Sequence, residues 1–168
     1  MKKTGIFYGT TTGTTEDVAR RIGKALGVTA DNIYDVAKTA PSRVGDYDVI
    51  ILGASTWGHG DLQPDMDDFL RGVEVLDLKG KDVAVFGCGD DTMADTFCNG
   101  VGEMYDRLKG TGAKMIGDFG TIGYTFTDSK AVPKDAAEAE GLLIDDVNHS
   151  DMTSKRVYEW AAELVKEE

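Results

Sequence analysis

The chain reads Gly9-Thr10-Thr11-Thr12-Gly13-Thr14-Thr15 between an apolar run at Thr4 to Tyr8 and a helical pattern. Glycine lets a backbone approach a ligand closely, and the N–H groups at a helix N-terminus attract an anion. A nucleoside-triphosphate loop would place a lysine beside the last threonine, so a single phosphate fits this loop better. An ordinary capped turn is the alternative. The candidate phosphate-binding residues are Thr10, Thr11, Thr12, Gly13, Thr14 and Thr15.

Strand and helix patterns alternate along the rest of the chain. Unbroken apolar runs are typical of parallel strands that are buried on both faces. The alternation predicts a single α/β domain over residues 1–168, a doubly wound five-stranded parallel sheet with helices on both faces. The expected strands are Thr4 to Tyr8, Asn32 to Val36, Asp48 to Gly53, Asp82 to Gly87 and Ala113 to Phe119. The expected helices carry Val18 to Leu26, Asp65 to Leu70, Asp95 to Leu108 and Asp151 to Lys166.

Length and composition predict a cytoplasmic protein. With 168 residues, of which 41% are hydrophobic, the chain is long enough for one domain with a substantial core. No apolar run approaches the roughly 20 residues that span a bilayer, and the N-terminus enters a strand without a signal-peptide pattern. Cys88 and Cys98 make neither a disulfide framework nor a metal-binding spacing, so we expect reduced thiols and no metal.

The chain is strongly acidic, with 30 acidic against 18 basic side chains and a net charge of −12. This charge disfavours binding to nucleic acid and to anionic membranes, and it attracts basic partners. Solubility alone is the alternative explanation. The acids that follow two of the candidate loops are Asp61, Asp65, Asp67 and Asp68, and Asp90, Asp91 and Asp95.

The carboxyl ends of three expected strands carry glycine-rich loops. A doubly wound sheet binds its ligand at these ends, where the strand order reverses. The loops lie at residues 9–13, 55–61 and 87–91, so we expect them to share one rim.

These motifs, in register over essentially the whole chain, resemble those of the flavodoxins, and specifically the long-chain type. The matching residues are Gly9 to Thr15, Thr56-Trp57 through Gly60-Asp61-Leu62, and Gly87-x-Gly89-Asp90 through Asp95-x-Phe97. The resemblance implies a flavodoxin-like strand order of 2-1-3-4-5 and a noncovalently bound FMN cofactor. The segment from about Gly120 to Asn148 is similar to the insertion that interrupts the last strand in long-chain members.

The resemblance also assigns roles around the flavin ring. Trp57 offers an aromatic face for stacking, and Gly58 has the conformational freedom to turn its carbonyl toward the ring. Many members place a tyrosine on the other face, where this chain offers Met93. That methionine either covers the ring through a sulfur–aromatic contact or is the first core residue of the next helix. The implied flavin-site residues are Thr56, Trp57, Gly58, His59, Gly60, Gly89, Asp90, Met93, Asp95, Phe97 and Cys98.

His59, next to the flavin loop, is either a surface residue without a role or a source of pH dependence, because histidine changes charge near neutral pH.

By resemblance the protein is a low-potential one-electron carrier that uses the semiquinone/hydroquinone couple of FMN and has no catalytic residues. The acidic rim predicts basic-surfaced redox partners, namely reductases and low-potential acceptors, that bind a monomer in brief encounters. The alternative is an FMN-dependent NAD(P)H:quinone-type oxidoreductase. A phospho-accepting receiver is disfavoured, because strand three ends in Ser55-Thr56-Trp57 rather than in an aspartate.

Overall fold

The computed structural model describes residues 2–57, 60–92, 96–121, 123–126, 128–133 and 136–167. Strands and helices alternate through most of this range, as the sequence predicts. The strands are β1 (Thr4–Gly9), β2 (Ile33–Asp35), β3 (Val49–Trp57), β4 (Asp61–Leu62), β5 (Asp82–Cys88), β6 (Lys114–Met115), β7 (Phe119–Gly120), β8 (Glu138–Ala139) and β9 (Leu142–Ile144). The helices are α1 (Thr14–Leu26), α2 (Pro64–Val73), α3 (Asn99–Leu108) and α4 (Ser150–Glu167).

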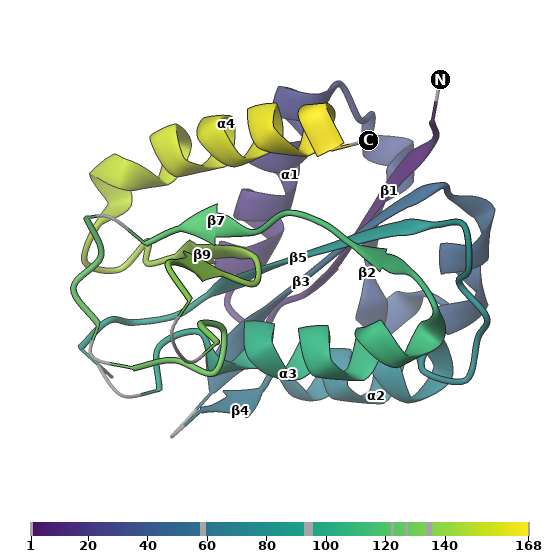
Figure 1. Cartoon of the computed structure of the whole chain (residues 1–168), viewed down its shortest axis with the longest axis horizontal. Coiled ribbons are helices and arrows are strands. Elements are labelled where there is room, and N and C mark those ends of the chain that lie inside the picture. Colours follow the sequence, from purple (N-terminus) through teal and green to yellow (C-terminus); the bar gives the residue numbers. More distant parts are fainter. Residues whose placement is uncertain are drawn as a thin grey trace.

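The main sheet is parallel in the order β2-β1-β3-β5-β6. This order confirms the expected 2-1-3-4-5, because β4 is only a short strand that turns back against the end of β3. The register pairs Gly9 with Ala54 and Ala54 with Gly87. The loops that follow β1, β3 and β5 therefore begin side by side, at the end of the sheet away from the N-terminus (Figure 1).

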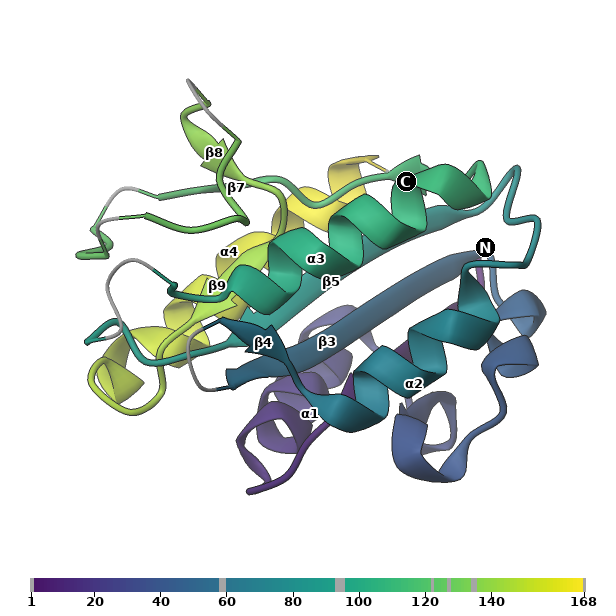
Figure 2. The same ribbon diagram turned by 90° about the horizontal axis from the view of Figure 1, so that it is seen from below.

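Helices cover both faces of the sheet. Helices α1 and α4 lie on one face, and α2 and α3 lie on the other (Figures 1 and 2). Successive side chains of a strand point to opposite faces, so Val49 and Ile51 pack on the α1/α4 side, whereas Ile50 and Leu52 pack on the α2/α3 side. Burial on both faces explains the unbroken apolar runs of β3 and β5.

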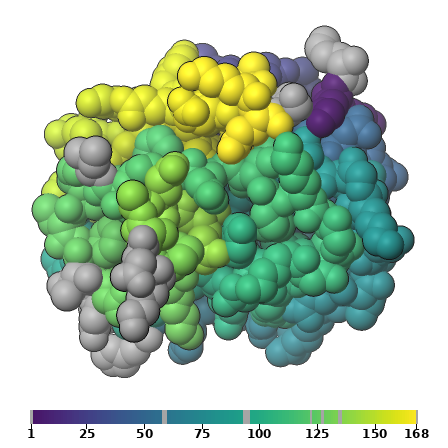
Figure 3. Space-filling model, in the orientation of Figure 1, coloured from purple at the N-terminus to yellow at the C-terminus, as the bar shows by residue number. Residues whose placement is uncertain are grey.

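Glycine at position 53 lets two central strands pack against α4. A Cβ on Gly53 of β3 would lie 2.0 Å from Cζ of Phe86 on β5, so only glycine leaves room for this ring. The Phe86 ring in turn packs 6.4 Å from the ring of Trp160 on α4, measured between centroids. In the space-filling view, α4 borders the surface formed by α3 and the residues that follow it (Figure 3).

The fifth strand differs from the expected Ala113 to Phe119. β6 pairs with the first half of β5 and β9 pairs with its second half, both in parallel, so residues 116–141 separate two pieces of one sheet edge. The chain leaves the sheet at Gly117, which has a φ of 91°, and β7 pairs antiparallel with β8 instead. The expected insertion at Gly120 to Asn148 was therefore misplaced, because β9 belongs to the sheet.

Helix α3 begins at Asn99 rather than near Asp95. Cys98, immediately before the helix, has a φ of 51°, in the left-handed region that ends or precedes helices. The chain from Thr96 to Cys98 forms a turn, and Asp95 lies outside the described residues. Within the described residues, every helix is too short or too polar to cross a membrane.

Candidate functional site

The loop after β1 presents free backbone N–H groups. Gly13 has a φ of 95°, and its N–H donates to Thr10 Oγ1 at 3.0 Å. The N–H of Asp17 donates to Gly13 O at 3.0 Å, so the N–H groups that precede it in the first turn have no acceptor within the helix. Together with the surrounding hydroxyls, these donors suit an anion.

Trp57 is an exposed aromatic residue at the end of β3. Its side chain is 41% exposed, whereas that of Trp160 is fully buried. The N–H of Gly60 donates to Trp57 O at 3.0 Å, and the φ of 109° at Gly60 closes the turn into β4. A large ring that remains exposed at a strand end is a face on which a planar ligand can stack.

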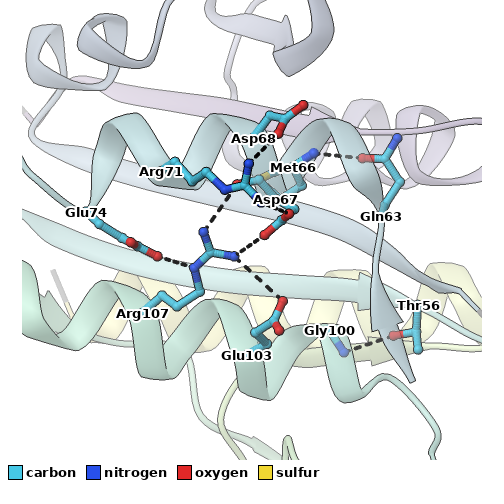
Figure 4. Close-up of polar contacts among 10 residues, drawn as sticks. All are labelled: Thr56, Gln63, Met66, Asp67, Asp68, Arg71, Glu74, Gly100, Glu103 and Arg107. Atoms are coloured by element: carbon cyan, nitrogen blue, oxygen red, sulfur yellow. Dashed lines mark hydrogen bonds and ion pairs between the residues drawn. The ribbon is translucent and has the colours of Figure 1, made fainter. Parts of the chain in front are cut away.

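Thr56 joins the end of β3 to α3. Its Oγ1 accepts a hydrogen bond from the N–H of Gly100 at 3.0 Å (Figure 4). Gln63 caps α2 in the same way, since its Oε1 accepts from the N–H of Met66 at 2.9 Å. These contacts fix the loop that carries Trp57 between the starts of two helices, and they leave the hydroxyl proton of Thr56 to be donated.

The loop after β5 runs close to α3 and to β9. A Cβ on Gly89 would lie 3.1 Å from both the N and the Sγ of Cys98, so this position has little room for a side chain. The N–H of Gly89 donates to Ile144 O at 2.9 Å. Asp90 accepts from the N–H of Thr92 at 2.9 Å and from its hydroxyl at 2.6 Å. These bonds from Thr92 hold the pKa of Asp90 below its ordinary value, so the carboxylate is charged at neutral pH.

A cavity of about 250 Å³ lies where these loops meet, and we call it the rim cavity. It brings together the end of β3, the start of α1 and the loop after β5, as the sequence predicts. Its lining residues are Thr11, Thr12, Thr14, Ser55, Thr56, Trp57, Cys88, Gly89, Asp90, Asp146 and Val147.

Six other predicted site residues belong to these loops without lining the rim cavity: Thr10, Gly13, Thr15, Gly60, Phe97 and Cys98. The ring of Phe97 is buried and lies 5.1 Å from that of Phe126, measured between centroids. The Sγ of Cys98 faces the carbonyl of Gly87 at 3.7 Å. Phe97 and Cys98 can therefore contact a ligand in the cavity only through their backbone atoms. Gly58, His59, Met93 and Asp95 lie outside the described residues.

Two lining residues, Asp146 and Val147, come from the loop between β9 and α4, which sequence reasoning missed. That reasoning assigned the segment to the insertion, although it carries the same signal as the other loops. An apolar run at Leu142 to Ile144 ends in two aspartates before a helix. The side chain of Asp146 accepts from the hydroxyl of Thr153 at 2.7 Å, which fixes it against the first turns of α4.

Two of the three acids on α2 form ion pairs with arginine. Asp67 and Asp68 lie 2.9 and 3.2 Å from Arg71, and Asp67 also lies 2.7 Å from Arg107 (Figure 4). These acids do not line the rim cavity. Among the described residues that line the cavity, the acids are Asp90 and Asp146, of which the sequence suggested only Asp90.

Cys88 lines the rim cavity, but its burial disfavours the thiolate. Removal from water raises the pKa of its thiol to about 12. The protonated thiol is a weak nucleophile and a poor metal ligand at neutral pH. Both cysteines are free and buried. The arrangement is therefore suited to packing against a ligand rather than to covalent attack on it.

A larger cavity of about 390 Å³ lies between β7, β8 and α4. Arg156 is buried there, with its guanidinium carbon 3.8 Å from the centroid of the Tyr124 ring. Its Nη2 also donates to Gly123 O at 3.4 Å. None of the described residues of the three sequence motifs lines this larger cavity. The rim cavity is therefore the candidate functional site.

Known proteins resemble the chain over nearly its whole length. The family model described as Flavodoxin matches residues 6–160. Flavodoxin 1 of Escherichia coli K12 is 39% identical over 168 residues, which cover 99% of this chain and 95% of that protein. The flavodoxin of Haemophilus influenzae is 38% identical, with coverages of 99% and 96%. The crystal structure of Fusobacterium nucleatum flavodoxin bound to flavin mononucleotide aligns with a TM-score of 0.89 at 28% identity, covering 99% of each chain.

Proposed function

The chain belongs to the flavodoxin family, and from this premise we propose that it carries electrons between redox proteins by means of FMN bound noncovalently in the rim cavity. Flavodoxins are electron carriers rather than enzymes. One observation carries the proposal: a single cavity joins the N-terminus of α1, the exposed ring of Trp57 and the loop at Gly89 and Asp90. The first of these suits a phosphate, and the other two suit a planar ring with a polar edge.

The residues present fit FMN at its phosphate end. The hydroxyls of Thr11, Thr12 and Thr14 line the cavity beside the free N–H groups of α1. Thr10, Gly13 and Thr15 complete the loop, and Thr10 holds its turn through the bond to Gly13. These donors are neutral, and they match one phosphate on a retained cofactor better than a triphosphate that is turned over.

The residues also fit the ring end. Trp57 would stack on one face of the ring, and Thr56 and Gly60 hold its loop in place. The backbone groups of Gly89 and Asp90, which line the cavity, would meet the polar edge of the ring. A Cβ on Gly89 would crowd Cys98. We carry over Gly58, His59, Met93, Asp95, Phe97 and Cys98 from the family resemblance, with Phe97 and Cys98 acting through the backbone.

Bound FMN supplies the chemistry, because its ring accepts and releases one electron at a time. The protein contributes the environment of that ring. The ionised carboxylate of Asp90 beside the cavity opposes the addition of negative charge, which lowers the midpoint potential. Of the strand ends that line the cavity, Cys88 is buried and Trp57 is exposed, so we place the approach of a partner on the side of Trp57.

The net charge of −12 supports redox partners with basic surfaces, including reductases and low-potential acceptors. We propose that the protein meets them as a monomer in the cytoplasm. The two free, buried cysteines suit such a reducing compartment. The alternative function, quinone reduction with NADH or NADPH, is not favoured by the family.

An anaerobic reductive titration tests this function. Visible spectroscopy should show that protein loaded with FMN is reduced in two separate one-electron steps. Rapid mixing with NADH or NADPH should leave the bound flavin oxidised until a reductase is added. A protein that binds no FMN would overturn the proposal, and direct two-electron reduction by the nicotinamide would favour the oxidoreductase.

A further inference from the structure

Asp145 is a buried carboxylate one residue beyond β9. It is 1% exposed, and it accepts four hydrogen bonds from N–H donors. Oδ1 accepts from the N–H groups of Val147 and Asn148 at 3.0 and 2.9 Å. Oδ2 accepts from the N–H of Asp91 at 3.0 Å and from Nδ2 of Asn148 at 2.9 Å. Burial of a charged group is stabilised by such donors, so this side chain is held in one orientation.

These donors belong to two different walls of the rim cavity. Asp91 follows Asp90 in the loop after β5, whereas Val147 follows Asp146 in the loop after β9. The carboxylate of Asp145 therefore bridges the two walls through backbone groups, which are fixed in position by the chain.

Asn148 extends the same connection. Its Nδ2 donates to Asp90 Oδ1 at 2.7 Å and to Asp91 Oδ1 at 3.3 Å, besides its bond to Asp145. A third bridge joins Nε2 of His149 to Oδ2 of Asp91 at 2.6 Å. The two loops thus meet through several bonds, of which only those to Asp145 are made by a buried carboxylate.

We propose that Asp145 is a positioning residue for FMN: its carboxylate sets the separation of the two walls that enclose the flavin ring, without touching the cofactor. The inference rests on the proposed function. Asp145 does not line the rim cavity. Asp90 on one wall and Asp146 and Val147 on the other wall do line it. Loss of the bridge should let the walls separate and weaken their contacts with the ring, while the phosphate end at α1 remains intact.

A metal ion is the competing explanation for this cluster. Ligand atoms of Asp91, Asp145 and His149 lie within 4.8 Å of one another. However, the oxygens of Asp145 already accept four N–H donors, which account for their lone pairs, and Nε2 of His149 is turned to Asp91. Hydrogen bonding therefore explains the cluster without an ion.

The test is Asp145→Asn, which keeps the size of the side chain but turns one oxygen into a donor that faces other donors. Apoprotein is titrated with FMN and, separately, with riboflavin, which lacks the phosphate, and flavin fluorescence is followed. Both dissociation constants should rise by the same factor, about 10- to 100-fold, as for loss of bonds to a charged group. Hydrogen exchange at the Asp91 amide should quicken, while exchange at Val85 in β5 stays unchanged.

Two further variants separate the possible causes. Asp151→Asn removes the same charge from an exposed position at the start of α4 and should leave both dissociation constants unchanged. Thr12→Ala, in the phosphate loop, should weaken FMN binding but not riboflavin binding. If Asp145→Asn does not fold, Asn148→Ala breaks three of the side-chain bonds at an exposed residue and should show the same parallel loss.

Several results would overturn the inference. One is an unchanged flavin affinity in folded Asp145→Asn. Another is a loss of affinity for FMN without a loss of affinity for riboflavin. A third is FMN binding by the wild-type protein that a chelator weakens and Zn²⁺ restores. In each of these cases the wild-type protein still binds FMN, so the proposed function stands. Failure of the wild-type protein to bind FMN would instead refute the function itself.

Discussion

The side-chain oxygen of Thr56 accepts the backbone N–H of Gly100 at 3.0 Å, so the strand that carries Trp57 also caps the first turn of α3. Thr56→Ala should lower the free energy of unfolding by about 1 kcal/mol, as for loss of a helix cap. Urea unfolding of the apoprotein measures this change. Thr56→Ser retains the oxygen and should recover most of the stability. Equal losses in both variants would show that the methyl group, rather than the cap, is responsible.

The arrangement of the main sheet and of the three glycine-rich loops at its rim follows from local sequence patterns. The apolar runs of β1, β3 and β5 predict buried parallel strands, and the glycines that follow them predict loops at one rim. The sheet order and the rim cavity confirm both predictions. Such local signals are strong because parallel strands must be apolar on both faces.

Other features depend on contacts between distant residues. β9 has only three residues, and the bend at Gly117 separates it from β6. Its place beside β5 therefore depends on strand pairing and not on a hydrophobic pattern that the sequence displays. For the same reason the wall at Asp146 was missed. The left-handed Cys98, which delays the start of α3, has no local sequence signal because only glycine favours that conformation strongly.

The pairing of acids is equally hidden from the sequence. Arg107 on α3 reaches Asp67 on α2 and Glu74, the residue that follows α2, a contact between residues far apart in the chain (Figure 4). Counting acids near a motif therefore overstates the field at the cavity, because the count includes acids that arginine neutralises.

Trp57→Ala should weaken FMN binding by about tenfold or more, because the stacking face is lost, yet leave the unfolding midpoint nearly unchanged since the side chain is exposed. Titration of apoprotein with FMN measures the affinity, and urea unfolding measures the stability. Trp57→Phe keeps a smaller ring, so its affinity for FMN should lie between those of the wild-type protein and of Trp57→Ala. Tyr158→Ala removes another exposed aromatic ring, on α4, which does not line the rim cavity, and it should leave the affinity unchanged.

We predict that the free energy of unfolding depends on pH through the carboxyl group of Glu140. Burial, followed by the charge of Asp106, raises the pKa of its carboxyl group from 4.5 to about 7. The folded protein thus holds this proton more tightly than the unfolded chain does. The contribution of Glu140 to stability is fully present below pH 4.5 and is lost as the pH rises through about 7.

Glu140→Gln should therefore be more stable than the wild-type protein at pH 8, by an amount on the order of 1 kcal/mol after solvent screening. The difference should shrink as the pH is lowered. Urea unfolding of both proteins over a series of pH values measures it. A difference that is the same at every pH would show that the carboxyl group does not titrate in this range.

Asp146 and Asp68 allow a direct test of which acids set the potential, because each carries one charge but only Asp146 lines the cavity. The side chain of Asp68 is 75% exposed on α2, so solvent screens its charge. A carboxylate about 12 Å from the ring, at an effective dielectric constant of roughly 20 to 40, opposes an added electron by about 0.7 to 1.4 kcal/mol. This energy corresponds to about 30 to 60 mV for one electron.

Asp146→Asn should accordingly raise the midpoint potential for the second electron by about 30 to 60 mV at low ionic strength. Asp68→Asn should change it by much less, because Asp68 is exposed on α2 and does not line the cavity, so water and ions screen its charge. Anaerobic potentiometric titration of both variants measures the shifts. The shift for Asp146→Asn should also shrink with added salt, because ions screen a charge near the surface. Equal shifts in the two variants would mean that net charge, rather than position beside the cavity, determines the potential.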